Sequence, residues 1–282
     1  MRRTAAAKRN TEMKPHILIT AGDPLGIGPE IVVKALSSPR TRAAADFTVI
    51  GDTRALLKAG FRNGYARVLP ADAAGPGPGR RRPLAASGLA SFKAVELALE
   101  LLAEGRAPAL VTAPVSKEAW SLAGVKHTGH TDLFRESAGR EPLMAFTLGK
   151  VRAALVTEHL PVSRLHWKIK KALVVEKALL FYGALRRAGI ARPRITLAAL
   201  NPHAGDGGLL GREELLELEP AAARLRARGL AVAGPLPTDA AWAAHLKGLS
   251  DGILCLYHDQ ALGPLKVLPG AARAVHWTWG LP

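Results

Sequence analysis

The sequence predicts an α/β fold in which helices cover a largely parallel sheet. Short apolar runs rich in β-branched residues alternate with longer helical patterns along the whole 282-residue chain. This alternation is typical of parallel strands that are joined through helices. Apolar residues make up 48% and charged residues 22% of the chain, a balance typical of globular proteins with a buried core. No apolar stretch reaches the roughly 18 residues that a membrane-spanning helix requires.

The first strand is expected at residues 16–20, where HILIT is apolar and partly β-branched. A helix is expected at 29–37, because Pro29 suits the first helical position and Glu30 the positive end of the helix dipole. The same reasoning predicts further strands at 47–50, 66–69, 109–112, 153–156, 195–200, 230–233 and 252–256. Helices are predicted at 53–59, 88–104, 116–123, 163–188, 212–228 and 239–247.

Two segments do not fit the alternation. Residues 71–86 are rich in Gly, Pro and Arg and are expected to form a surface loop. Residues 1–12 lack both apolar periodicity and the apolar region of a secretory signal, so we expect a disordered tail.

The charge balance indicates an anionic partner. Lys and Arg number 39 against 23 Asp and Glu, a net charge of +16. The basic residues are spread out, aromatic residues are only 5% of the chain, and no RNA-binding signature is present. An acidic small molecule is therefore expected rather than nucleic acid or a membrane. Cys255 is the only cysteine, which excludes an internal disulfide and favours the reducing cytoplasm.

Three of the nine histidines follow predicted strands: His159, His203 and His258. Open α/β sheets bind ligands at the carboxyl ends of their strands, and imidazole is a common metal ligand. A metal site and three ordinary surface histidines are both compatible with this pattern. Asp259 could orient His258 or join a ligand shell.

Four other features are compatible with both a ligand site and ordinary structure. The glycine-rich loop at 22–30 is either a phosphate loop or a tight turn between a strand and a helix. His130 and Thr131 lie in a loop, where Thr131 is also a candidate helix N-cap. Residues 205–208 (GDGG) form either an anion-binding nest or a flexible turn. Lys266, expected on a loop near the histidines, could hold a phosphate or carboxylate.

Six motifs occur in the order and approximate spacing of one known family. They are ITAGDPLGIGPE, VTAPVSKEAW, TGHTDLF, LNPHAGDGGLLGREE, GPLPTD and YHDQALGPLK. NPHAGDGG and YHDQ in this order are together highly specific. From about residue 13 to residue 282, the chain resembles the 4-phosphooxy-L-threonine (4-hydroxythreonine-4-phosphate) dehydrogenases of pyridoxal phosphate biosynthesis, the PdxA family.

The resemblance implies a fold like that of isocitrate and isopropylmalate dehydrogenases, with two α/β domains and the active site in the cleft between them. The first domain would span residues 13–132. The second, with the metal ligands and the dimer interface, would span residues 133–282. This fold binds NAD without a GxGxxG fingerprint, which would explain why the sequence has none.

The resemblance also implies a reaction. NAD, or alternatively NADP, would oxidise the substrate hydroxyl, and the resulting 3-keto acid would decarboxylate to 3-amino-2-oxopropyl phosphate. A divalent metal (Zn, Mg, Co or Mn) would activate the hydroxyl and polarise the ketone. Its ligands would be His159, His203 and His258, one of them supplied by the partner subunit of a homodimer.

The remaining site residues also follow from the motifs. The substrate would be bound by His130, Thr131 and Lys266. The cofactor would be bound by Asn201, Gly205 and Gly207. Asp239 and Asp259 match acidic residues near the reaction centre, and their role in proton transfer is a hypothesis.

Two features depart from the family pattern. The family continues past GLP through a segment whose arginine binds the substrate phosphate and which completes the first domain, whereas the sequence here ends at Pro282. His276 stands where the family has a substrate-binding asparagine. The alternatives are therefore a paralogue acting on threonate or erythronate 4-phosphate or on a cyclic diol, and a truncated inactive homologue that only binds. A basic RNA-binding protein ranks last.

Overall fold

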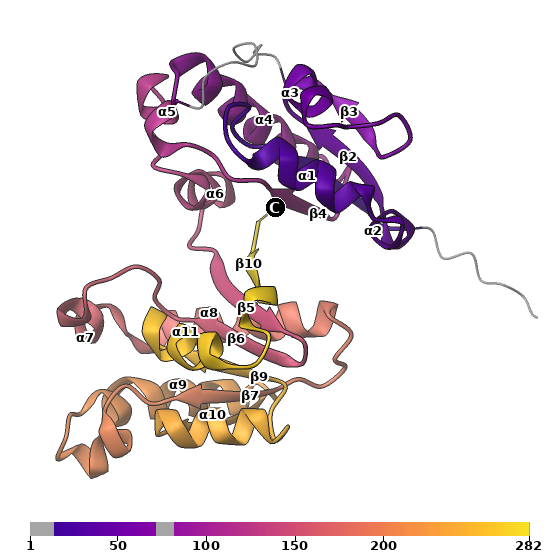
Figure 1. Cartoon of the computed structure of the whole chain (residues 1–282). Helices are drawn as coiled ribbons and strands as arrows, with labels where there is room; N and C mark the ends of the chain where they lie inside the picture. The colour runs from indigo at the N-terminus through magenta and orange to yellow at the C-terminus, as the bar shows by residue number, and fades with distance from the viewer. Residues whose placement is uncertain (1–13, 72–81, 282) are drawn as a thin grey trace, which may run out of the picture. The chain divides into compact units, whose positions relative to one another are not determined.

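Two α/β units make up the computed structural model, which describes residues 14–71 and 82–281 (Figure 1). They divide between Gly139 and Arg140, whereas the division expected from the sequence falls within α6 (His130–Ala138). The expected N-terminal tail and most of the expected 71–86 loop lie outside the described residues. In the part of the chain that is described, no helix has the length and apolarity to cross a membrane.

The first unit contains a four-stranded parallel sheet in the order β3-β2-β1-β4. Its strands are β1 (His16–Thr20), β2 (Asp46–Ile50), β3 (Arg67–Leu69) and β4 (Ala109–Thr112). The long helix α4 (Ala85–Ala103) packs on β1, β2 and β4. Side chains of α1 (Gly28–Ser37) and α3 (Thr53–Lys58) bury Ile19 and Val49. The other helices are α2 (Pro39–Ala44), α5 (Lys117–Leu122) and α6.

The second unit contains a six-stranded mixed sheet in the order β10-β5-β6-β9-β7-β8. Four neighbouring strands run parallel: β6 (Val151–Leu155), β9 (Gly252–Cys255), β7 (Arg194–Ala198) and β8 (Ala231–Leu236). On the other side of β6, β5 (Leu143–Leu148) runs antiparallel to both β6 and β10 (Val275–Trp279). All four residues of β9 are buried, as expected for a strand covered on both faces.

Helices cover both faces of this second sheet (Figure 1). One face packs against α8 (Lys171–Arg187) and α9 (Glu219–Ala227). The other packs against α10 (Thr238–Leu246) and α11 (His258–Val267), and it contains the buried Cys255. The remaining helical segments are η1 (Val162–Arg164), α7 (Leu165–Lys168), η2 (Pro202–Gly208), the π-helical η3 (Glu214–Leu218) and η4 (Ala271–Arg273).

The α/β class and all eight predicted strands are confirmed, and the sheets are largely parallel as expected, but two predicted helices are not continuous. The second sheet also contains β5, which was not predicted and is antiparallel to both its neighbours. The helix predicted at 163–188 is divided into η1, α7 and α8. The helix predicted at 212–228 starts as the π-helical η3, and α9 follows with Pro220 in its first turn.

Candidate functional site

The three predicted histidines follow strands whose carboxyl ends share one edge of the second sheet. β6, β9 and β7 are parallel neighbours, and their registers pair Leu155 with Cys255 and Leu254 with Leu197. The segments after these strands therefore leave the sheet at the same edge, where open α/β sheets bind their ligands. The topological basis of the sequence prediction is thus confirmed.

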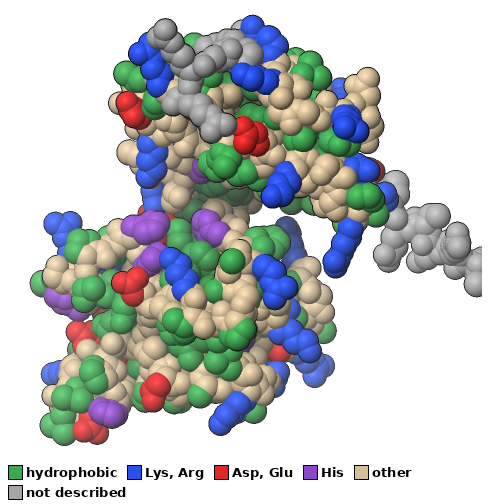
Figure 2. Space-filling view, in the orientation of Figure 1, with side chains coloured by type: hydrophobic (Ala, Val, Ile, Leu, Met, Phe, Trp, Pro, Cys, Tyr) green, Lys and Arg blue, Asp and Glu red, His purple; other side chains and the backbone are tan. Residues whose placement is uncertain are grey.

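His159 and His258 lie together at this edge. Their ring centroids are 5.3 Å apart, with the rings inclined at 43°, and Figure 2 shows histidine side chains gathered on the second unit. His258 begins α11, and its Nδ1 lies 2.7 Å from Oδ1 of Asp259. A carboxylate on Nδ1 fixes the imidazole so that Nε2 is available as a ligand.

His203 is not close enough to complete this pair within one chain. Among residues 14–71 and 82–281, no three His, Cys, Asp or Glu side chains are grouped so that they could hold a metal ion. His203 is exposed in the loop after β7. One chain therefore brings together two of the three predicted ligands.

The loop that carries His203 has an unusual backbone. Five successive residues, from His203 to Gly207, have positive φ angles between 46° and 80°. Three of them, His203, Ala204 and Asp206, are not glycine, and the left-handed region costs such residues about 1–2 kcal/mol each. Gly205 and Gly207 adopt it without this cost, and Gly205 is buried.

Asn201, at the start of this loop, is held by two carboxylates. Its Nδ2 donates to Glu213 Oε2 and to Glu214 Oε2, both at 2.8 Å. The hydrogen bond from Asn201 holds the pKa of the Glu213 carboxyl below its usual range. Neither glutamate was predicted as a site residue, although both belong to the motif LNPHAGDGGLLGREE.

Gln260 is a second residue that sequence reasoning missed. It is buried, and it connects three segments at the carboxyl edge of the sheet. Its Nε2 donates to Ala199 O at 2.6 Å and Thr238 Oγ1 at 2.9 Å, and its Oε1 accepts from Leu256 N at 2.6 Å. The only signal in the sequence was its place in YHDQ, two residues after His258.

Two other predicted residues lie on helices of the second unit. Asp239 is exposed in the first turn of α10, next to the Thr238 that binds Gln260. Lys266 was expected on a loop, but it lies in the last turn of α11. The rise of an α-helix places it about 12 Å along the axis from His258, so these two residues lie at opposite ends of α11.

His130 and Thr131 belong to the first unit, at the start of α6. The N-cap prediction for Thr131 was wrong: the N-cap position is Gly129, and α6 begins at His130. The side chain of Asp132 instead accepts a hydrogen bond from the backbone N–H of Thr128 at 3.1 Å. This contact links the segment before α6 to its first turn.

The imidazole of His130 is packed between aromatic rings. Its centroid lies 5.9 Å from that of Trp120 and 5.7 Å from that of Phe134. Burial lowers the pKa of His130 to about 4, so the ring is neutral at physiological pH. Its Nε2 is buried without a hydrogen-bond partner among the described residues. Buried polar atoms of this kind call for an explanation, and a ligand would satisfy this one.

His276, which we expected to replace a family asparagine, interacts electrostatically with His159. On β10 it is in register with Phe146 of β5, and the two rings stack with centroids 5.0 Å apart. Partial desolvation lowers the pKa of the exposed His276, and electrostatic repulsion from His159 lowers it further.

The glycine loop after β1 is a tight turn. A Cβ at Gly22 would lie 2.3 Å from Pro114 O, and a Cβ at Gly28 would lie 2.2 Å from Ala21 O. The turn is further held by the buried Asp23, whose Oδ1 accepts from Leu25 N at 2.8 Å. Close backbone approach is therefore sufficient to explain these glycines.

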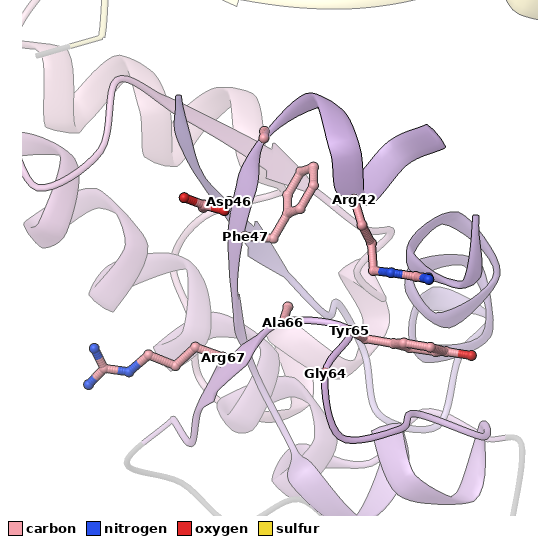
Figure 3. A pocket seen from close by; sticks show the side chains of 8 residues that line it. Arg42, Asp46, Phe47, Gly64, Tyr65, Ala66 and Arg67 are labelled. Carbon is pink, nitrogen blue, oxygen red and sulfur yellow. The ribbon is translucent and has the colours of Figure 1, made fainter. Parts of the chain in front are cut away.

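A separate cavity of about 320 Å³ opens in the first unit (Figure 3). Its lining includes Asp46 and Arg67, the first residues of β2 and β3, which places it at the amino ends of the strands. Arg42 lies 5.1 Å from the centroid of the Tyr65 ring on one side of the cavity. None of the site residues predicted from the sequence lines this cavity.

Comparisons with known proteins agree with these motifs. Residues 40–282 match the profile of the family described as pyridoxal phosphate biosynthetic protein PdxA. A 4-hydroxythreonine-4-phosphate dehydrogenase from Methylococcus capsulatus is 38% identical over 96% of this chain and 87% of its own. A D-threonate 4-phosphate dehydrogenase from Cupriavidus necator is 37% identical, over 95% of this chain and 86% of its own.

A solved structure shows the same likeness in three dimensions. The 4-hydroxythreonine-4-phosphate dehydrogenase from Klebsiella pneumoniae has a TM-score of 0.85 at 32% identity, covering 96% of this chain and 88% of that one. With a profile match over residues 40–282 and relatives above 30% identity over nearly the whole sequence, the chain belongs to the PdxA family.

Proposed function

We propose that this protein is an NAD-dependent dehydrogenase of 4-phosphooxy-L-threonine that acts in pyridoxal phosphate biosynthesis. The substrate hydroxyl is oxidised to a ketone, and the 3-keto acid then loses CO2 to give 3-amino-2-oxopropyl phosphate. The observation that carries the proposal is the pairing of His159 and His258, 5.3 Å apart, in a member of this family. A cytoplasmic location accords with Cys255 as the only cysteine.

The donor set at the sheet edge fits a divalent metal. Two imidazoles converge there, and Asp259 occupies Nδ1 of His258 so that Nε2 can serve as a ligand. When bound, the metal would act as a Lewis acid on the substrate oxygen, and NAD would accept the hydride from the carbon that carries it. All-nitrogen ligation is compatible with Zn, Co, Mn or Mg, which differ in affinity.

The third ligand is assigned to a second copy of the chain. His159 and His258 come from one chain, and His203 does not group with them among the described residues. We therefore assign His203 to the partner's site, which requires a homodimer with symmetric, shared active sites. An active site in a cleft, as in the isocitrate dehydrogenase-like arrangement, belongs to the same proposal.

The other residues have defined roles in this proposal. His130 would use its unpartnered Nε2 to bind the substrate, together with Thr131. The exposed Lys266 would attract the phosphate. The exposed Asp259 and Asp239 would exchange protons with the substrate and with solvent. Changing either of these to asparagine should lower turnover, and an unchanged rate would remove that residue from the role.

The direct test is NADH formation from 4-phosphooxy-L-threonine by the 282-residue chain, with and without a chelator. Turnover that the chelator abolishes and Co²⁺ or Zn²⁺ restores would support the proposal. The same assay should be run on His159→Ala and on a control, Lys168→Ala, which changes an exposed lysine in α7. Only His159→Ala should lose activity. Zinc binding without turnover would favour a non-catalytic homologue.

One observation favours a second candidate substrate, D-threonate 4-phosphate. His276 interacts electrostatically with His159, at a position where the resemblance to the family implies asparagine, and a relative that is 37% identical is a D-threonate 4-phosphate dehydrogenase. Comparing kcat/KM for the two phosphates, in the native chain and in His276→Asn, would decide between them.

A further inference from the structure

We propose that Glu214 is a positioning residue that fixes the left-handed loop at 202–208 and thereby the placement of His203. The inference rests on the proposed function only for the role of His203.

Glu214 is nearly inaccessible to solvent, with 1% of its surface exposed. A buried carboxylate is costly unless its oxygens accept hydrogen bonds. Here Oε1 accepts from the backbone N–H of Leu200 at 2.7 Å and of Asn201 at 2.8 Å, and Oε2 accepts from Asn201 Nδ2 at 2.8 Å. All three donors belong to the two residues that lead from β7 into the loop.

The loop closes directly around this contact. A Cβ at Gly205 would lie 2.8 Å from Glu214 Oε2, and a Cβ at Gly211 would lie 2.3 Å from Asn201 Nδ2. The glycines of the motif therefore let the backbone approach the carboxylate–amide pair on both sides. Within the loop, Leu210 N donates to Gly205 O at 3.0 Å, so the segment after the left-handed turn returns to Gly205.

The left-handed run needs such an external restraint. Non-glycine residues persist in the left-handed region where their surroundings over-determine the backbone, commonly at functional sites. His203 is exposed, so its own packing does not fix its conformation. Glu214 lies in η3, a π-helix of about one turn, and such turns also often mark functional sites.

Replacement of Glu214 by glutamine keeps the shape of the side chain but exchanges one hydrogen-bond acceptor for a donor. If the glutamine carbonyl faces the two backbone N–H groups, its NH2 faces Asn201 Nδ2, so two donors meet. The flipped amide places donors against the backbone instead. Glu213→Gln is the matched control, because Glu213 contacts the same Asn201 amide and a glutamine there can still present its carbonyl oxygen to it.

The first readout is amide hydrogen exchange of the segment 196–210 in the full chain. In Glu214→Gln we expect exchange at Leu200 and Asn201 to be at least ~10-fold faster, the size of one buried charged hydrogen bond. Glu213→Gln should leave it unchanged. Exchange in Glu214→Gln equal to that of the native chain would overturn the proposal.

A restored hydrogen-bond pattern tests the same point if Glu214→Gln folds poorly. In a chain carrying Glu213→Gln, Glu214→Gln and Asn201→Asp, both glutamine amides can donate to the carboxylate that replaces the Asn201 amide, in place of the original bonds. Recovery of slow exchange relative to the Glu213→Gln, Glu214→Gln double variant supports the proposal. Failure to recover contradicts it.

The second readout concerns His203. Titration with Co²⁺ should give a roughly tenfold weaker affinity in Glu214→Gln, whereas a purely stabilising role would lower the melting temperature and leave the affinity of the folded protein unchanged. An unchanged affinity combined with fast exchange would refute the link to His203. If the native chain binds no metal, the proposed function fails, and hydrogen exchange alone decides the role of Glu214.

Discussion

The assignment of His203 to the partner's site predicts subunit complementation. The variants His159→Ala and His203→Ala should each be inactive as pure dimers. In a mixed dimer, one site combines the intact His159 and His258 of one subunit with the intact His203 of the other. The second site of that dimer retains only His258.

The expected activity follows from this geometry. Random pairing of equal amounts makes about half of all dimers mixed, and one of the two sites in each is complete, so about a quarter of the native activity should return. The assay is NADH formation after the two differently tagged variants have been unfolded and refolded together. The mixed dimer is then purified through both tags and measured alone.

A matched pair of variants provides the control. His159 and His258 come from the same chain, so mixing His159→Ala with His258→Ala produces no complete site and should restore nothing. Recovery in this control, or no recovery with His203→Ala when mixed dimers are present, would refute the division of ligands between the subunits.

Three further predictions concern the surroundings of the site. His130 has a pKa of about 4 in the folded chain, against the ordinary histidine value of 6.5. Between pH 6.5 and pH 4, the His130 ring is therefore protonated in the unfolded chain but neutral in the folded chain, so unfolding takes up a proton. About 3 kcal/mol of stability should be lost over that range, and urea titrations of His130→Phe should lack this part of the loss. Gly88→Ala should lower the free energy of unfolding by about 3 kcal/mol, because its Cβ would lie 2.0 Å from Ala119 O. Gly183→Ala, in open space on α8, should instead raise the free energy of unfolding by roughly 0.5–1 kcal/mol. Equal melting temperatures of the two variants would contradict this prediction. Gln260→Leu leaves the three hydrogen-bond partners of the Gln260 amide unpaired. It should lower the free energy of unfolding, measured with denaturant, by about 2–4 kcal/mol. A smaller decrease would indicate that water replaces the amide.

Local pattern was sufficient to predict most of the fold. Buried strands such as β9 are short continuous apolar runs, and the strand–helix alternation gave the class. The edge of the sheet that carries the histidines also followed, because parallel strands share their carboxyl ends. The proximity of His159 to His258 did not follow, since it depends on β6 lying next to β9. Strand order is a long-range property that the local pattern does not contain.

Two errors arose from long-range contacts that replace local hydrogen bonds. Lys266 was expected on a loop, yet α11 continues through Pro264 and includes Lys266. Proline removes the N–H that would bind the carbonyl of Gln260, four residues earlier. Trp242 Nε1 donates to that carbonyl instead, at 2.9 Å, so the helix leaves no acceptor unpaired there.

The helix predicted at 163–188 is interrupted for a similar reason. Glu217 accepts a hydrogen bond from Lys171 N at 2.7 Å and pairs with Lys170 Nζ at 3.2 Å. These contacts satisfy the start of α8 with a carboxylate from a segment that is distant in the sequence. The apolar periodicity of residues 163–188 cannot predict this contact with Glu217, so it did not predict the interruption of the helix.

The burial of Cys255 gives the chain a practical property. The thiol lies in the core of the second unit, where burial raises its pKa, so the reactive thiolate is scarce in the folded protein. Alkylating reagents should therefore leave the native chain unmodified and label it only as it unfolds. A cysteine introduced on the surface could then carry a single fluorophore without removal of the native one, so that one chosen position of the chain could be followed in solution.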